Sequence, residues 1–172
     1  MEVSVKHPTL QRALVTAMTL GVLLTPAVVR AAGDVSVVLT AARITVVDGK
    51  ETKSPAEQAR PGDVIEYRAE YRNDGAAPVR QLAATLPVPN GMEYLPRTAA
   101  PQTLLASLDG TRFEPVPLKR RVRLADGREV TREVPFSEYR YLRWPLGTLG
   151  QRQSREVAAR VRVSPLQIAA AR

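Results

Sequence analysis

The sequence predicts an all-β protein, an immunoglobulin-like antiparallel β-sandwich of about seven to nine strands. Residues 61–95 hold two strand-like segments, separated by an Asn-Asp-Gly turn and followed by a Pro-Asn-Gly turn. In residues 63–72 charged side chains alternate with four apolar ones, Ile65, Tyr67, Ala69 and Tyr71. This period of two gives a strand one apolar and one charged face, whereas a helix repeats every 3.6 residues.

Residues 1–31 have the features of a secretory signal peptide. Basic residues precede an uncharged apolar run over residues 13–29, and the run leads into a Val-Arg-Ala tripeptide that fits a small-residue cleavage site. A retained membrane anchor is the alternative interpretation. The run is shorter than the roughly 20 apolar residues of a spanning helix, and Pro26 interrupts its end. We therefore expect cleavage and a domain that begins at residue 32.

Cleavage would leave a chain without histidine or cysteine. The leader carries His7, which is the only histidine, and the sequence contains no cysteine. No imidazole would then activate a serine or cysteine nucleophile, and neither a disulfide nor a zinc site of the His and Cys types could form. We therefore expect a non-catalytic protein without cofactor or metal, stabilised by its hydrophobic core alone.

The same features predict the compartment and the partners. A leader, no cysteine for lipid attachment and no second long apolar run together predict a product in the periplasm or in the medium. The formal net charge is +8, and removal of residues 1–31 lowers it to +6, because three basic residues and one acidic residue are lost. A basic exported protein meets envelope proteins, anionic polysaccharide and lipid, and we do not expect nucleic acid as its partner.

The domain is expected to open with long strands. Residues 34–47 are rich in β-branched side chains and form either one long strand or two strands that meet at Ala41-Ala42. Residues 48–60 show no apolar alternation, so we predict a polar loop there, before Pro61-Gly62 starts the next strand. A strand at residues 79–86 follows, and the prolines after it end it, because proline cannot donate to a central ladder.

Shorter elements are predicted in the second half of the chain. Residues 92–95 resume a strand briefly, and residues 96–109 fit either a short helical turn or an edge strand. In the closing strand, four side chains are expected to face inward: Val157, Ala159, Val161 and Val163. The remaining elements are a strand at 138–144, a turn at 147–153, that closing strand at 156–163, and a tail at 166–172 beyond the sandwich of residues 32–165.

An insertion near residues 116–136 holds a predicted hairpin around Ala125-Asp126-Gly127. A two-residue Asp-Gly loop would place Arg121 opposite Arg132, which is an unfavourable like-charge pair. We therefore predict a three-residue loop with Gly127 in the left-handed conformation. That loop gives the cross-strand pairs Arg123 with Glu129, Lys119 with Glu133, Val122 with Val130, and Leu118 with Val134.

Several landmarks between residues 61 and 163 occur in the order of a known family. They are Pro61-Gly62-Asp63, Tyr67, Asn73-Asp74-Gly75, Pro78, Leu86-Pro87, Pro89, Gly91, Tyr94 and Leu146-Gly147-Thr148-Leu149. In these residues the chain resembles the bacterial conserved repeat called domain of unknown function 11, with residues 113–139 as an insertion. The resemblance implies an extracytoplasmic sandwich of the kind found as stalk or surface modules of cell-envelope proteins, without established catalytic residues.

The candidate binding site is the basic cluster of the predicted hairpin, Lys119, Arg120, Arg121 and Arg123. Clustered cations attract polyanions through their summed field, so an exposed hairpin could bind lipopolysaccharide phosphate or an acidic polysaccharide. Acidic residues at 129 and 133 interleave with the cluster. The alternative interpretation is therefore a solvated edge whose charges oppose strand-to-strand aggregation.

Aromatic residues form a second candidate site. Tyr139 and Tyr141 share one face of a predicted strand and could stack against a sugar, while Trp144 projects from the other face. Large aromatic side chains of a sandwich belong more often to the core. We predict a core position for Trp144, the only tryptophan.

Calcium binding by loop oxygens is a third possibility. Asp48 with Glu51, or Asn73 with Asp74, could contribute ligands, but each pair supplies two residues where calcium takes six to eight oxygens. The Asn-Asp-Gly segment is better explained as turn chemistry.

Catalysis by carboxylates alone is the remaining enzyme hypothesis. Glu66 and Glu70 lie four apart on one predicted strand, hence on one face, and a glycoside hydrolase uses two such acids. They alternate with Arg68 and Arg72, which favours an exposed salt-bridged surface. Our leading hypothesis is an exported, non-catalytic module with a structural or interaction role in the envelope or outside the cell, whose edge strands offer strand-addition sites.

Overall fold

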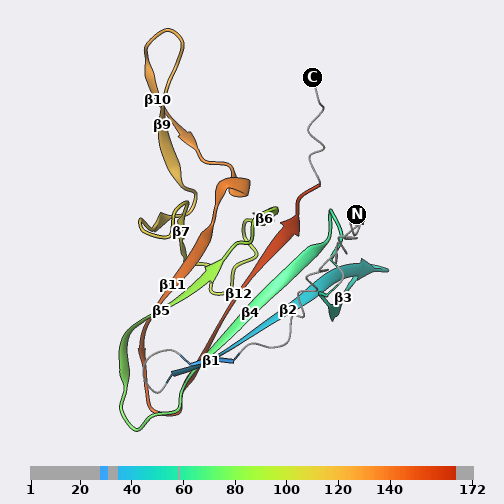
Figure 1. Ribbon diagram of the computed structural model, residues 1–172, viewed down its shortest axis with the longest axis vertical. Helices are drawn as coiled ribbons and strands as arrows, with labels where there is room; N and C mark the ends of the chain where they lie inside the picture. Colours follow the sequence, from blue (N-terminus) through green and yellow to red (C-terminus); the bar gives the residue numbers. More distant parts are fainter. Residues whose placement is uncertain (1–27, 31–34, 58, 166–172) are drawn as a thin grey trace, which may run out of the picture.

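The computed structural model describes residues 28–30, 35–57 and 59–165 of the chain. The C-terminal tail at 166–172, and the expected leader except residues 28–30, lie outside the described residues. The all-β prediction is confirmed, because the described part consists of antiparallel strands and one short 3-10 helix, Phe136–Glu138 (Figure 1). Twelve strands are described, more than the seven to nine that were predicted.

The larger sheet has the strand order β1-β2-β4-β12-β6, with β3 added beside β2. Every pairing in it is antiparallel. Its strands are β1 (Val28–Arg30), β2 (Val35–Val47), β3 (Lys50–Pro55), β4 (Val64–Asn73), β6 (Met92–Tyr94) and β12 (Ser154–Val163).

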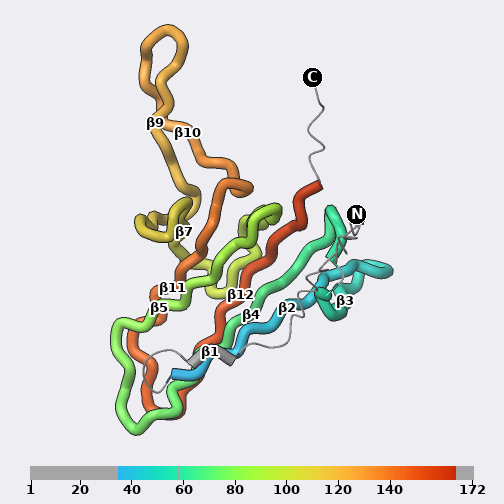
Figure 2. The backbone as a smooth tube through the Cα atoms, viewed as in Figure 1, coloured from blue at the N-terminus to red at the C-terminus, as the bar shows by residue number. Residues whose placement is uncertain are grey.

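The second sheet has the strand order β5-β11-β7-β8, and its buried side chains pack against those of β4 and β12 of the first sheet. Its strands are β5 (Val79–Pro87), β7 (Leu105–Ser107), β8 (Glu114–Pro115) and β11 (Tyr141–Leu149). A separate two-stranded hairpin, β9 (Lys119–Arg123) with β10 (Glu129–Glu133), extends from this side of the molecule. Figure 2 shows it standing apart from the body of the sandwich.

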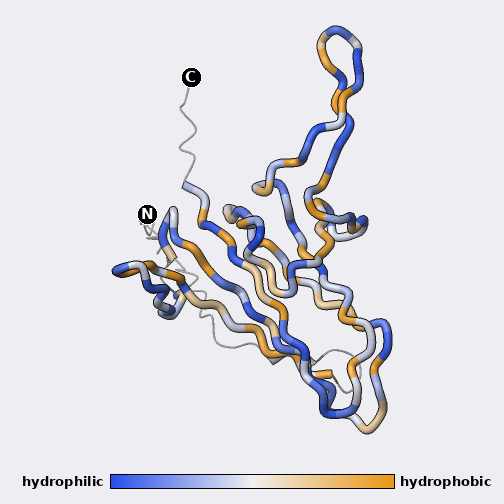
Figure 3. Tube along the Cα trace, turned by 180° about the vertical axis from the view of Figure 1, so that it is seen from behind, coloured by the Kyte–Doolittle hydropathy of each residue, from blue (hydrophilic) through white to orange (hydrophobic). Residues whose placement is uncertain are grey.

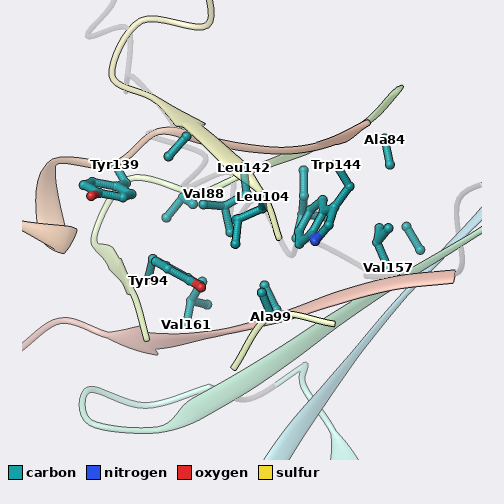
Figure 4. Packing of buried hydrophobic residues seen from close by; sticks show 14 of the residues in the cluster. Ala84, Val88, Tyr94, Ala99, Leu104, Tyr139, Leu142, Trp144, Val157 and Val161 are labelled. Carbon is teal, nitrogen blue, oxygen red and sulfur yellow. The ribbon is translucent and has the colours of Figure 1, made fainter. Parts of the chain in front are cut away.

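The hydrophobic core lies between the two sheets (Figure 4). Trp144 is 1 % exposed, and its indole N–H donates to the carbonyl of Pro101 at 2.8 Å, so its predicted core position is confirmed. The period-two pattern of β4 holds: Ile65 and Ala69 are buried, and the two tyrosines between and after them are half-buried. In β12 the expected inward residues Val157, Ala159 and Val161 are buried and Val163 is half-buried. Figure 3 shows the resulting alternation of hydropathy along the long strands.

The loop predicted at residues 48–60 is wrong in its first half, because β3 forms there and pairs with β2. Val47 lies opposite Lys50, so the connection is a two-residue Asp48-Gly49 turn, and both residues have positive φ, 51° and 75°. Asp-Gly flanked by strands is a strong hairpin signal, whereas β3 itself is polar and mostly exposed. A strand held by its backbone ladder and by charged side chains needs no apolar alternation, which is why the alternation test missed it.

Three further boundaries are settled or corrected. Residues 34–47 contain one strand rather than two, and residues 96–109 contain a strand, β7, which lies between β11 and β8 rather than at a sheet edge. The strand predicted at 138–144 begins later, at Tyr141, because the 3-10 helix precedes it. It also runs on to Leu149 through register shifts near Gly147, which shortens the turn predicted at 147–153.

The predicted hairpin register is confirmed. Arg123 lies opposite Glu129, Val122 opposite Val130 and Lys119 opposite Glu133. The amide of Val134 donates to the carbonyl of Leu118, and Gly127 has φ of 84°, as a three-residue loop requires. The charge-pair comparison therefore selected the correct register.

Candidate interaction site

The β9–β10 hairpin divides the predicted basic cluster between two faces. Side chains alternate along β9, so Lys119, Arg121 and Arg123 project from one face and Arg120 from the other. All four side chains are exposed. The structure thus brings three of the four predicted residues together.

Arg120 is held by an ion pair at the base of the hairpin. Its guanidinium donates two hydrogen bonds to the Glu138 carboxylate, at 2.6 and 3.0 Å. Across the ladder Arg120 faces Arg132, a like-charge pair that accompanies the confirmed register. The carboxylate of Glu138 offsets this repulsion, so the charge of Arg120 is already engaged within the fold.

The other three cations make no ion pair within the described residues. Opposite them lie Glu133, Thr131 and Glu129, in ladder register but without ion-pair contact. The face therefore presents three cations and two carboxylates on a projecting two-stranded ribbon. Its net charge is positive, and that positive charge is available to a partner.

A cavity of about 320 Å³ lies where the hairpin meets the loop after β7. Its charged lining mixes basic Arg112, Lys119 and Arg120 with acidic Asp109 and Glu114. Hydrogen bonds from the backbone N–H of Thr111, with others nearby, hold the pKa of Asp109 well below its usual value. The cavity is a mixed-charge surface that does not favour an anion.

Glu66 lies at the centre of an ionic cluster on the outer face of the larger sheet. Its carboxylate accepts hydrogen bonds from Lys53 at 2.6 Å, Arg68 at 3.0 Å and Arg160 at 3.1 Å. Glu51 binds the far side of Arg160 through two bonds of 2.7 Å, and Glu156 pairs with Arg68. These six residues, Glu51, Lys53, Glu66, Arg68, Glu156 and Arg160, are called the Glu66 cluster below.

The cluster corrects the interpretation of Glu66 as a surface residue. Glu66 is 8 % exposed, whereas Glu70 on the same face is exposed and makes no ion pair in the described part of the chain. Burial acts to raise the pKa of Glu66, but the hydrogen bonds from the three basic side chains outweigh it and lower the pKa to about 2. A general acid needs a raised pKa, so Glu66 is not suited to the role of general acid.

The Glu66 cluster also joins strands that are not neighbours. β2 and β4 lie between β3 and β12, and the residue of β3 in the row of Arg160 is Pro55, four residues from Glu51. A flat sheet would therefore separate Glu51 from Arg160 by more than three strand spacings of roughly 4.8 Å each. Their bidentate contact requires the β2–β3 end of the sheet to curl toward its outer face. β3 is therefore fixed both by its ladder with β2 and by side chains.

The aromatic candidates belong to the core rather than to a sugar-binding surface. Tyr139 is fully buried, and its ring contacts Tyr94 at 6.2 Å and Phe136 at 5.2 Å between centroids. Its hydroxyl accepts the backbone N–H of Leu118 at 2.7 Å, which ties the base of the hairpin to the core. Tyr141 is half-buried. The two tyrosines therefore form no exposed stacking platform.

Asn73 is a turn residue, as its sequence context predicted. Its Oδ1 accepts the backbone N–H of Gly75 at 3.0 Å, and its Nδ2 donates to the carbonyls of Ala77, Leu149 and Gly150. The side chain is fully buried and links the β4–β5 turn to the turn after β11. The Asn-Asp-Gly sequence indicated the turn, but no feature of the sequence indicated that Asn73 also links the two turns.

The edge of β2 that faces away from β4 is only partly covered. β3 pairs with residues 42–47, and β1 pairs with residues 36–38 in the register Val28 to Val38 and Arg30 to Ser36. Among the described strands, none pairs with residues 39–41 on this side. The sequence suggested edge strands in general, and the topology identifies this one.

Residues 28–30, 35–57 and 59–165 hold neither a metal-ligating cluster nor a membrane-spanning helix. No group of three or more His, Asp or Glu side chains there could hold a metal ion. No helix within the same ranges has the length and hydropathy of a membrane-spanning segment.

Comparison with known proteins gives no match: no family model, no curated protein and no solved structure corresponds to the chain.

Proposed function

We propose that this protein is an exported, non-catalytic β-sandwich module that acts in the cell envelope or outside the cell by pairing a strand edge with an extended protein segment. The observation that supports this most is the edge of β2 at residues 35–41. Its described partner is the three-residue strand β1, which lies inside the segment that export would remove. An extended segment of a partner can add to such an edge through main-chain hydrogen bonds.

The chemistry of the side chains favours binding over catalysis. After cleavage at residue 31 the chain has no histidine and no cysteine. Among the described carboxyl groups, those with a shifted pKa all have it lowered: Glu51, Glu66, Asp109 and Asp126. Lowered pKa values suit ion pairing and turn formation, whereas carboxylate-based hydrolysis needs one raised value.

Export is tested by expressing the full chain in a bacterium, followed by fractionation and N-terminal sequencing. We expect the protein in the periplasm or medium, beginning at Ala32, because residues 29–31 fit a cleavage site. A Leu23→Arg variant, which places a charge in the apolar run, should remain in the cytoplasm with its leader intact. Full-length wild-type protein in the cytoplasm would overturn the proposal.

Binding through the edge is tested with a photo-crosslinking side chain at position 38, or at position 46 as a control. Both are valines on the same face of β2, but β3 covers the edge at Val46, which is also the more exposed of the two, 64 % against 37 %. We expect crosslinks to a protein from position 38 and few from position 46. Equal yields from the two positions would count against edge binding.

A second candidate function, binding of an anionic glycan or lipid, is favoured by one observation. Lys119, Arg121 and Arg123 share a face of a projecting hairpin without ion pairs to the described residues. The test is co-sedimentation with vesicles of anionic or neutral lipid and binding to an acidic polysaccharide. The triple change to Gln should abolish binding, while Arg120→Gln should have little effect, because Arg120 is paired with Glu138. Equal binding by the triple variant and wild type would exclude this function.

A further inference from the structure

The edge of β2 changes its covering when the leader is removed. β1 consists of residues 28–30, and the expected cleavage follows residue 31, so export would take away the strand that pairs with residues 36–38. What remains is a seven-residue edge, residues 35–41, bounded by β3, where Pro55 lies opposite Ala42. This step rests on the proposed export of the protein.

The uncovered edge has no charged residue. Its sequence is Val-Ser-Val-Val-Leu-Thr-Ala, in contrast to β3, which carries Lys50, Glu51 and Lys53 along the adjacent edge. Edge strands of monomers are protected by charges, prolines or bulges, because an uncharged, β-branched edge pairs readily with another chain. Val38, at its centre, is 37 % exposed. This edge has the composition of a pairing surface rather than of a protected one.

We infer that the partner of this edge is the same edge of a second copy of the chain, paired antiparallel about a two-fold axis at Val38. This register places Val38 opposite its counterpart, Val37 opposite Leu39, Ser36 opposite Thr40 and Val35 opposite Ala41. It is the one antiparallel register that pairs all seven residues. A shift by one residue would bring core-side residues opposite outer-face residues, which the pleat does not allow.

Both faces of the joined sheet fit this arrangement. On the inner face, Val37, Leu39 and Ala41 are half-buried and pack beside the core. Two such rows would meet across the axis and bury each other, because side chains directly opposite in a ladder lie about 5 Å apart. On the outer face the polar pair Ser36 and Thr40 would flank the two copies of Val38. The interface is isologous, so it closes as a dimer and leaves no further copy of this edge open.

The absence of cysteine allows a direct test of the axis. A Val38→Cys variant of the exported protein carries a single thiol, which would face its own counterpart with Cα atoms about 5 Å apart, within disulfide range. Mild oxidation should convert most of the protein into a covalent dimer. Val46→Cys is the matched control, since this more exposed valine lies on the same face of β2 beyond the paired residues. It should give less than about one tenth of the dimer.

A non-covalent measurement accompanies the crosslink. By light scattering the exported wild-type protein should have twice the mass of one cleaved chain. Val38→Lys, which places two like charges on the axis, should raise the dimer dissociation constant about tenfold or more, while Val46→Lys should leave it unchanged. Circular dichroism of the variants verifies that the fold is kept.

The outcomes separate this inference from the proposed function. A monomeric wild-type protein, or equal crosslinking of the two cysteine variants, would overturn the two-fold pairing. Crosslinks from position 38 to a different protein would also overturn it, while supporting the proposed module. Retention of residues 28–30 in the protein from cells would refute the proposed export and the uncovering of the edge together.

Discussion

The Glu66 cluster and the β9–β10 hairpin are both rich in arginine and lysine, but the structure uses the two regions differently. In the cluster, three cations converge on one carboxylate that is 8 % exposed, and two further carboxylates complete their pairing. In the hairpin, three cations share a face and make no ion pair within the described chain. The density of basic residues in the sequence therefore does not distinguish cations that are paired within the fold from cations that are available to a partner.

The number of neighbouring strands explains the difference. β4 and β12 lie inside the larger sheet, so side chains from β3, β4 and β12 converge on the outer face around Glu66. The hairpin has two strands and no described neighbour beyond them, and each cation there has one cross-strand partner to meet. A buried carboxylate without cations would be costly, whereas an exposed cation is solvated by water.

The largest effect is expected from removing the centre of the cluster. Glu66→Ala should lower the free energy of unfolding by about 3 kcal/mol, because three cations lose the carboxylate on which they converge. Chemical denaturation measures it. Glu70→Ala is the matched control, on the same strand and face but exposed, and should change stability by less than about 0.5 kcal/mol. Equal losses in the two variants would contradict the structural role of the cluster.

The second-largest effect is expected from acid, which should weaken the Glu66 cluster. The folded pKa of Glu66 is about 2 and its ordinary value is 4.5, so its contribution is complete above pH 4.5 and is lost as the pH falls toward 2. Between neutral pH and pH 2.5 this loss should reach about 2 kcal/mol. Denaturation of wild type and Glu66→Gln across this range isolates the effect, since other carboxyl groups titrate in both. Parallel curves for the two proteins would rule out the lowered pKa.

A smaller, local effect is expected in the loop of the hairpin. Gly127 has φ of 84°, and no atom lies within 4 Å of the point that a Cβ would occupy, so Gly127→Ala adds backbone strain without a clash. The hairpin should lose about 1 kcal/mol of local stability. Faster amide exchange in β9 and β10, with unchanged exchange in β4 and β12, would reveal it. Gly127→Asn should have a milder effect, because Asn tolerates the left-handed region better than Ala does.

The smallest effect on stability should come from the charges of the hairpin. Changing Lys119, Arg121 and Arg123 together to Gln should shift the melting temperature by less than about 2 °C, because their exposed side chains make no ion pair with the described residues. Calorimetry measures the shift. A large loss of stability would show that these cations are part of the fold, as those of the Glu66 cluster are.

Local pattern predicted those elements whose cause is local. The alternation in β4 and β12, the three-residue loop at Gly127 and the turn at Asn73 each depend on residues that are close in sequence or directly opposite in one hairpin. β3 was missed because its side chains are polar and its partner strand provides the ladder. Of the candidate site, the basic residues were identified, and strand alternation divides them between two faces, but the ion pair of Arg120 with Glu138 depends on the tertiary structure.

The sequence by itself determined the all-β sandwich, the inward faces of its long strands, the core position of Trp144 and the register of the hairpin, because periodicity, turn residues and cross-strand charge pairs act over short separations. Only the tertiary structure decided which charges are buried. Glu66 and Arg160 lie 94 residues apart in the chain and meet because β4 pairs with β12. The strand order likewise decided that the edge of β2 beside β1 is only partly paired, because long-range pairing sets which backbone groups lack a strand partner.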